Sequence, residues 1–508
     1  MSQASGVFVL PASRGWLPPL LLGGIGGLAA VLAVTAAGVA GLGVAIVLSC
    51  LALAVAAAAP RPGALLIAFA VLLPIHLLAM VLLFNAGVEH SVIRAFSAWK
   101  EAVALGLLGV LTMQRVAAGR LPRWRALDVF VLAFAALNLL YAFVPFTAPI
   151  DVPLGTRLHG LRDNAFFVVL YLIGRLAPLT VRQARLFAAT VIGVGAAGVM
   201  IGLLERFALP LSFFFDTLHY DDFSRDYLNL HYYTGIPYNF WTSVGNVRRG
   251  VSFYLGSHHF AMAAALVLPM VLVLRRPLRP FPAALRTPLL LLAIVGLALP
   301  LTRSVMLACL LQVLMIGSLT RRPHYSLTAV LSVMLLLGSS YLFLDLSGYV
   351  QDVAAAPTSS VATHVASWQN TGAIVRAYPL GAGIGVVDTV SARSGGVSGL
   401  LSGEGEYSLV VTSVGIPGLL LFMAMLASAA TTMLSTWGSA AEAPVRRLAL
   451  VTLALLVGFA VAGAFTQVRH VPAFLFPLWW LVGAVTSGAP AGDRHTRRPS
   501  PAPAGPAA

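Results

Sequence analysis

The chain has 508 residues, of which 59% are hydrophobic and 10% are charged, and its mean hydropathy is +0.90. Soluble domains contain about 25% charged residues, so the composition excludes a soluble globular domain and predicts a polytopic membrane protein. The formal charge of +15 is better explained by membrane topology than by a nucleic-acid partner. The cysteines, Cys50 and Cys309, both lie in apolar runs and predict neither a disulfide framework nor a metal site.

The predicted fold class is all-α, with about 14 transmembrane helices (12 to 14). A membrane-spanning helix needs roughly 20 mainly apolar residues. The first apolar stretch lacks a cleavage pattern and is followed at once by another stretch, which predicts an uncleaved helix rather than a signal peptide. Stretches that meet the length requirement lie at 17–38, 41–59, 64–85, 96–114, 126–147, 164–181, 184–206, 257–274, 285–301, 303–320, 326–345, 407–433, 447–466 and 471–488.

The basic residues predict the orientation of these helices. With fourteen spans both termini lie on one side, and 20 of the 32 Lys and Arg residues fall on that side. Three acidic residues accompany them: Asp128, Glu442 and Asp493. Because cytoplasmic loops carry the excess of Lys and Arg, we expect both termini in the cytoplasm.

Two long connections, 207–256 and 346–406, are predicted on the periplasmic side. Loops of this length are usually functional or disordered, and the first is rich in aromatic and acidic residues, which predicts an ordered cap beside the membrane. The predicted regions are N-terminal helices (1–156), a catalytic core (157–433), C-terminal helices (434–488) and a disordered cytoplasmic tail (489–508).

Several arginines on the predicted outer side are candidates for anion binding. Arg248 and Arg249 end the first long loop in NVRRGVSFYLGSHH, Arg303 separates two apolar runs, and Arg376 lies in the second long loop. Arginines also extend to the interface at helix ends without a function. However, the topology bias disfavours arginine on this side, and a guanidinium group suits bidentate binding of phosphate.

Other polar groups near the predicted spans have alternative explanations. Glu404 and Glu406 precede a long apolar run, where a carboxylate is either a candidate general base or an ordinary solvated loop residue. Arg162 lies in the cluster TRLHGLRDN, which also suits a simple membrane boundary. The adjacent His258 and His259 diverge on a helix, which favours interfacial histidines over a metal pair. The glycines of PLGAGIG lack the context of a dinucleotide site and predict a flexible turn.

In this order, the motifs resemble the O-antigen polymerase and ligase superfamily over roughly residues 157–430. The resemblance is carried by Arg248–Gly250 with Phe253 ahead of a span, by Thr-Arg-Ser at 302–304, by Trp368–Gly385 ending in PLGAGIG, and by EYSLVVTSVGIPGLLLF. It implies an inverting, metal-independent glycosyltransferase in the bacterial inner membrane, without a cofactor. Such an enzyme acts on a polyprenyl-diphosphate-linked glycan at the periplasmic face.

The resemblance also implies roles for individual residues. Diphosphate binding falls to Arg249, Arg303 and Arg376, with Arg248 and Arg162 in reserve. The ligase branch has a histidine base in a motif like HNxYL, whereas this chain has EGEYSL, so the base is Glu404 or Glu406.

The departure from the histidine motif favours a polymerase of O-antigen or exopolysaccharide repeats. A ligase transferring the glycan to lipid A core or protein is the first alternative. A secondary transporter or lipid-glycan flippase is the second, although matching internal halves are not evident in the sequence. The expected partners are the lipid-linked glycan and membrane lipid, with a chain-length regulator and a flippase as possible further partners, and no nucleic acid.

Overall fold

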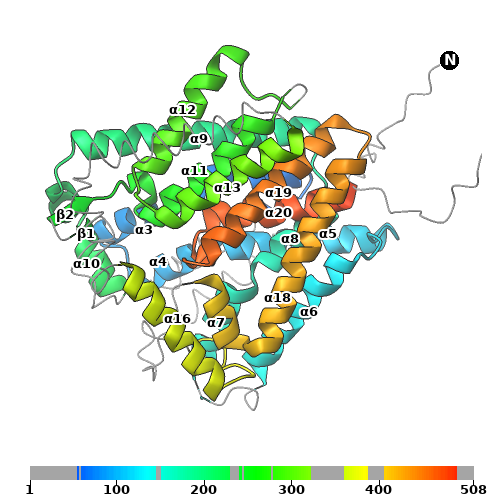
Figure 1. Cartoon of the computed structure of the whole chain (residues 1–508). Helices are drawn as coiled ribbons and strands as arrows, with labels where there is room; N and C mark the ends of the chain where they lie inside the picture. The colour runs from blue at the N-terminus through cyan, green and yellow to red at the C-terminus, as the bar shows by residue number, and fades with distance from the viewer. Residues whose placement is uncertain are drawn as a thin grey trace, which may run out of the picture.

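The computed structural model describes residues 54–55, 59–144, 150, 152–228, 239–242, 245–275, 278–321, 360–386 and 405–488. The predicted spans 17–38 and 326–345, most of 41–59, the tail 489–508 and Glu404 lie outside these residues. The described chain is helical apart from one small hairpin (Figure 1). Its first half contains α2 (Pro62–Leu72), α3 (His76–Asn85), α4 (His90–Ser97), α5 (Trp99–Ala117), α6 (Ala126–Phe143), α7 (Leu154–Ala165), α8 (Phe167–Leu176) and α9 (Val181–Phe207).

The second half begins with short elements and continues with longer helices. The short elements are η2 (Phe213–Thr217), α10 (Tyr220–Asp222), η3 (Phe223–Tyr227), β1 (Asn239–Thr242), β2 (Gly245–Arg248) and η4 (Ser252–Tyr254). They are followed by α11 (Ser257–Val273), η5 (Ala283–Leu285), α12 (Arg286–Ala298), α13 (Arg303–Thr320), α16 (Ser360–Ala377), α18 (Glu406–Ser439), α19 (Ala443–Gly463), η6 (Val468–His470) and α20 (Pro472–Gly488).

Five helices of the described chain are long and apolar enough to cross a membrane: α6, α9, α13, α18 and α19. The count rises to seven if each of two bent pairs forms one span. Only 39–61% of the residues in the apolar windows of the five helices are buried within the protein. The remaining apolar surface suits contact with lipid, which is consistent with a multi-pass membrane protein.

Bends interrupt two of the predicted spans. The stretch 64–85 divides into α2 and α3, which meet at 60°, and α4 and α5 meet at 42° near residue 98. The prediction for 164–181 also differs from the structure, because α8 covers only ten residues and α7 before it is polar. Hydropathy averages over about twenty residues, so it does not resolve these breaks.

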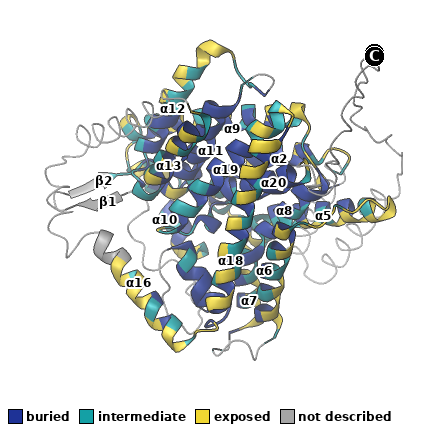
Figure 2. Cartoon of the chain, turned by 45° about the vertical axis from the view of Figure 1, so that its right-hand side comes forward, coloured by how far each residue is buried: buried dark blue, intermediate teal, exposed yellow. Residues whose placement is uncertain are grey.

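The core is built around α20, which packs closely against α8 (Figures 1 and 2). Trp479 and Trp480 of α20 are fully buried. Glycines allow the two backbones to approach: a Cβ on Gly174 would lie 2.2 Å from the Trp480 carbonyl oxygen, and one on Gly483 would lie 2.1 Å from the Tyr171 carbonyl oxygen. Small residues permit such close helix packing in membrane proteins.

The glycine-rich segment that follows α16 packs against a break inside α18. Gly415 has a φ of 72°, in the left-handed region that glycine adopts without strain. Backbone hydrogen bonds join Ala382 N to Thr412 O (2.8 Å) and Ile416 N to Pro379 O (2.9 Å). The segment predicted as a flexible turn is therefore packed against the interrupted helix.

Candidate functional site

Arg248 and Glu205 join the end of the hairpin to the end of α9. The buried Glu205 carboxylate accepts hydrogen bonds from the backbone N–H groups of Val251 (3.0 Å) and Ser252 (2.6 Å). Arg248 donates from Nη1 to the Leu209 carbonyl oxygen (2.6 Å), and its Nη2 lies 3.8 Å from Glu205 Oε1. These contacts give Arg248 a clear structural role in fixing the chain that carries Arg249.

Arg249 and Arg303 are brought together by the turn between α12 and α13. Arg249 donates from Nε to the Pro300 carbonyl oxygen (2.8 Å) and from Nη2 to Thr302 Oγ1 (2.8 Å). Gly250 N donates to the Leu299 carbonyl oxygen (2.8 Å), which holds the two segments side by side. Arg303 is the first residue of α13, directly after this turn.

The electrostatics of this pair favour an anion. Burial, and then the positive charge of Arg303, lower the pKa of Arg249 to about 10. Arg249 has no carboxylate partner within the described part of the chain, because its hydrogen-bond acceptors there are a carbonyl and a hydroxyl group. Leu301, in the same turn, has a φ of 53°, which is unusual for a bulky residue. Arg249 contacts the residue before Arg303 and interacts electrostatically with Arg303, and a pair of positive charges at one turn is suited to bind a negatively charged group.

A second cluster, which we call the ionic network, joins residues from distant parts of the chain. Glu406 lies at the first position of α18, and its Oε1 accepts a hydrogen bond from Arg469 Nε (2.7 Å). Arg469 belongs to η6, and it also donates to Asn164 at the end of α7. The members of the network are Lys100, Glu101, Arg162, Asp163, Asn164, Glu406, Arg469 and His470.

The remaining contacts extend the ionic network from α7 to α5. Arg162 Nε lies 2.9 Å from Asp163 Oδ1 and 3.9 Å from Glu101 Oε1, and Lys100 Nζ lies 3.2 Å from the same Glu101 oxygen. His470 Nδ1 lies 4.0 Å from Asp163 Oδ2. Burial opposes ionisation of Asp163, but Arg162 and His470 outweigh it and hold its pKa below the ordinary range.

The ionic network is open to solvent at two of its members. The side chains of Arg162 and His470 are 36% and 31% exposed, whereas the other charged members are nearly buried. Glu101 Oε2 is buried and has no hydrogen-bond partner among the described residues. The arrangement therefore combines an accessible edge with buried carboxylates, which suits proton transfer or the binding of a polar ligand.

Arg376 lies in another part of the molecule. It is exposed near the end of α16, where its Nε donates to the Gly372 carbonyl oxygen of its own helix (3.1 Å). The chain that follows packs against α7 and the break in α18. The contacts of the described residues thus bring Arg249 and Arg303 together and place Arg162 with Glu406 in the ionic network, but they join Arg376 to neither group.

Sequence reasoning missed four charged or titratable members of the ionic network. Lys100 and Glu101 interrupt an otherwise apolar stretch, and ionisable residues at membrane depth are functional candidates by default. Arg469 and His470 separate the last two apolar helices. The same rule could have identified them as candidates. His259, predicted at an interface, contacts the carbonyl oxygen of His470 through Nε2 (2.8 Å).

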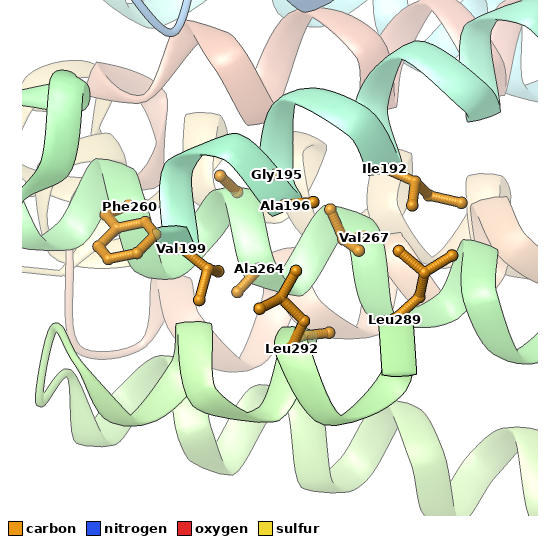
Figure 3. Close-up of a pocket in the computed structure, with 11 residues that line it drawn as sticks. Ile192, Gly195, Ala196, Val199, Phe260, Ala264, Val267, Leu289 and Leu292 are labelled. Atoms are coloured by element: carbon orange, nitrogen blue, oxygen red, sulfur yellow. The ribbon is translucent and has the colours of Figure 1, made fainter. Parts of the chain in front are cut away.

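An apolar void lies between α9, α11 and α12 (Figure 3). Its volume is about 10 Å³, and its wall includes Val199, Phe260 and Leu292. A void of this size has room for at most one water molecule and offers no polar side chain. It is a packing feature, and the candidate site is the pair Arg249–Arg303 with the ionic network.

The described residues contain no group of three or more His, Cys, Asp or Glu side chains placed to hold a metal ion. No protein-family model matches the chain, and no curated protein matches it.

Proposed function

We propose that this protein is an integral membrane glycosyltransferase that polymerises polyprenyl-diphosphate-linked oligosaccharide repeats at the periplasmic face of the bacterial inner membrane. The observation that carries the proposal is the placement of Arg249 beside Arg303. A leaving diphosphate gains negative charge as the glycosidic bond breaks, and preorganised positive groups stabilise that charge. The proposed topology has about 14 spans and both termini in the cytoplasm.

In the proposed reaction, an acceptor hydroxyl oxygen attacks the anomeric carbon of the lipid-linked glycan. The bond from that carbon to the diphosphate oxygen breaks, and the diphosphate leaves with the bonding electrons. The hydroxyl proton passes to a carboxylate within hydrogen-bond reach. Glu406 and Glu404 are the two candidates, and Glu406 supports the proposal through its place in an ionic network that reaches solvent.

A ligase would share the arginines and differ in its acceptor. A transporter or flippase is a second candidate from another class, favoured by the buried alternating charges of the ionic network, which also suit ion translocation. Deleting the gene separates these possibilities. Loss of a polymerase leaves single lipid-linked repeats outside, loss of a ligase leaves full-length lipid-linked polymer, and loss of a flippase leaves repeats on the cytoplasmic side.

Complementing the deletion strain with Arg249→Ala, Arg303→Ala and Arg376→Ala variants tests the site. We expect each to lower polymer formation by about 100-fold, the usual effect of removing one charge-stabilising donor, while membrane protein levels stay normal. Arg225→Ala is the matched control, because Arg225 is an exposed arginine of the same predicted loop that pairs with Asp222 instead of the turn at residues 299–303. Normal chain length in all three test variants would refute the assignment.

A further inference from the structure

A basic pocket lies where α5 and α8 end and α6 begins. Its volume is about 290 Å³. It is lined by five arginines from three segments, together with a residue of α20: Arg115, Arg120, Arg123, Arg125, Arg175 and Ser487. None of these residues belongs to the candidate site described above. A basic loop anywhere at this membrane face would satisfy the topology bias, so the convergence of guanidinium groups on one cavity needs a separate explanation.

Buried contacts behind the pocket fix its shape. Arg175 donates from Nε to Asp128 Oδ1 and from Nη2 to Asp128 Oδ2, each at 2.8 Å. Tyr171 donates its hydroxyl proton to the same carboxylate (2.5 Å). Arg175 Nη2 also donates to the Arg123 carbonyl oxygen (2.8 Å), which ties the linker between α5 and α6 to the end of α8. The pocket wall is therefore preorganised.

A second tie comes from α5. Arg115 donates from Nε (3.1 Å) and Nη2 (2.6 Å) to the Leu176 carbonyl oxygen at the end of α8. This pair of bonds holds the last turn of α5 against the same edge of the pocket. The arginines are thus arranged by the fold rather than by their own mutual interactions, which are repulsive.

The charge of the pocket is only partly compensated. Asp128 pairs with Arg175, whereas Arg115, Arg120 and Arg123 have no carboxylate partner in the part of the chain that the structure describes. Like charges around one cavity repel each other, and a bound anion would relieve that repulsion. Guanidinium groups bind phosphate oxygens in bidentate geometry, so phosphate is the ligand that this chemistry favours.

The surroundings of the pocket indicate the source of the phosphate. Leu121 and Trp124 lie in the same linker and are 61% and 71% exposed, and Met113 and Val116 are exposed on the last turns of α5. Tryptophan beside arginine at the end of a membrane helix is typical of the headgroup region. An apolar strip next to a phosphate site matches a phospholipid, whose acyl chains continue from the headgroup.

We propose that this pocket binds the headgroup phosphate of an anionic phospholipid, with the acyl chains lying along the exposed apolar side of α5. Arg120 and Arg123, both exposed at the rim, contact the phosphate, while Arg175 and Arg115 hold the wall. The lipid would tie α5, α6 and α8 together at this face of the membrane.

The test uses the purified full-length protein in detergent and adds phosphatidylglycerol, phosphatidylcholine or inorganic phosphate separately. We expect phosphatidylglycerol to raise the apparent melting temperature and to remain bound in native mass spectrometry. In an Arg120→Ala/Arg123→Ala variant its affinity should fall by at least about tenfold. These two exposed side chains leave the contacts of Arg175 and Arg115 intact, so the variant should fold. Arg225→Ala, which removes another exposed arginine, should bind as the parent does.

Three results would overturn the proposal. The first is no preference for phosphatidylglycerol over phosphatidylcholine. The second is an equal loss of lipid in the Arg225→Ala control, which would indicate general charge attraction. The third is stabilisation by inorganic phosphate that matches that by the lipid, which would identify a soluble phosphate compound as the ligand instead.

Discussion

Glu406 and Arg469 form an ion pair in which the side chains are only 3% and 2% exposed. Removing one partner of a buried pair leaves an uncompensated charge, which typically costs about 3 to 5 kcal/mol. The same carboxylate is a candidate base, so stability and catalysis must be separated experimentally. A variant that removes both charges provides that separation.

We predict that Glu406→Gln lowers the apparent melting temperature in detergent, because the guanidinium group of Arg469 then lacks its carboxylate. A Glu406→Gln/Arg469→Gln variant should recover most of that loss. If Glu406 is the base, the stabilised double variant makes no polymer yet still binds lipid-linked donor. Glu404→Gln is the parallel variant for the other candidate. Full turnover in both Gln variants would place the base elsewhere.

At this scale the sequence predicts residue types better than partners. An ionisable residue beside an apolar run is often functional, and this rule identifies Glu406, Arg249 and Arg303 as candidates. Nothing in local periodicity pairs Glu406 with Arg469, 63 residues away, or Arg249 with Thr302. These pairings depend on the way helices assemble, which a single sequence does not report.

The break in α18 and the glycine-rich segment after α16 form one packing unit. A Cβ on Gly415 would lie 2.2 Å from the Leu380 carbonyl carbon, and one on Gly381 would lie 2.6 Å from Gly415 N. Both glycines also have positive φ, at 72° and 101°. A side chain at either position therefore adds backbone strain to a steric clash.

We predict that Gly381→Ala and Gly415→Ala each lower the apparent melting temperature and the yield of folded protein in detergent. Gly438→Ala is the matched control, because it lies in the same helix with open space around its Cβ position. In that position alanine should be neutral or stabilise by up to about 1 kcal/mol. Wild-type stability for Gly415→Ala would show that the segment repacks freely.

Hydropathy predicts straight elements accurately and interrupted ones poorly. The predicted span 303–320 coincides with α13, and 184–206 lies within α9. The bends after α2 and α4, and the break at Gly415, were missed because a window of apolar residues looks the same whether its helix is straight or bent. The hairpin of β1 and β2 was also missed, since its strands are only four residues each.

For the whole molecule, membrane topology is the most consequential prediction still to be tested. The loop containing α10 is predicted outside and the turn between α18 and α19 inside. Asp222 and Ala441 are exposed positions in these two connections. Both native cysteines can be replaced beforehand, and the described one, Cys309, is buried and has no disulfide partner among the described residues.

We predict that, in a Cys50→Ala/Cys309→Ala background, Asp222→Cys reacts with a membrane-impermeant maleimide in intact spheroplasts. Ala441→Cys should react only after the membrane is permeabilised. The positive-inside bias predicts that Ala441 faces the cytoplasm, because Arg446 and Arg447 follow it in the chain. The reverse labelling pattern would invert the orientation and place the proposed diphosphate site on the cytoplasmic side.

The break in α18 also has a consequence for depth in the membrane. The helix has 34 residues, so an unbroken form would be about 51 Å long, well beyond the hydrocarbon thickness of about 30 Å. The part after the break, Ile416–Ser439, is itself roughly 36 Å long and can cross the bilayer alone. The turns before Gly415 are then not needed to cross the hydrocarbon, and we infer that they place the ionic network at the membrane–water boundary, where its exposed members, Arg162 and His470, face water.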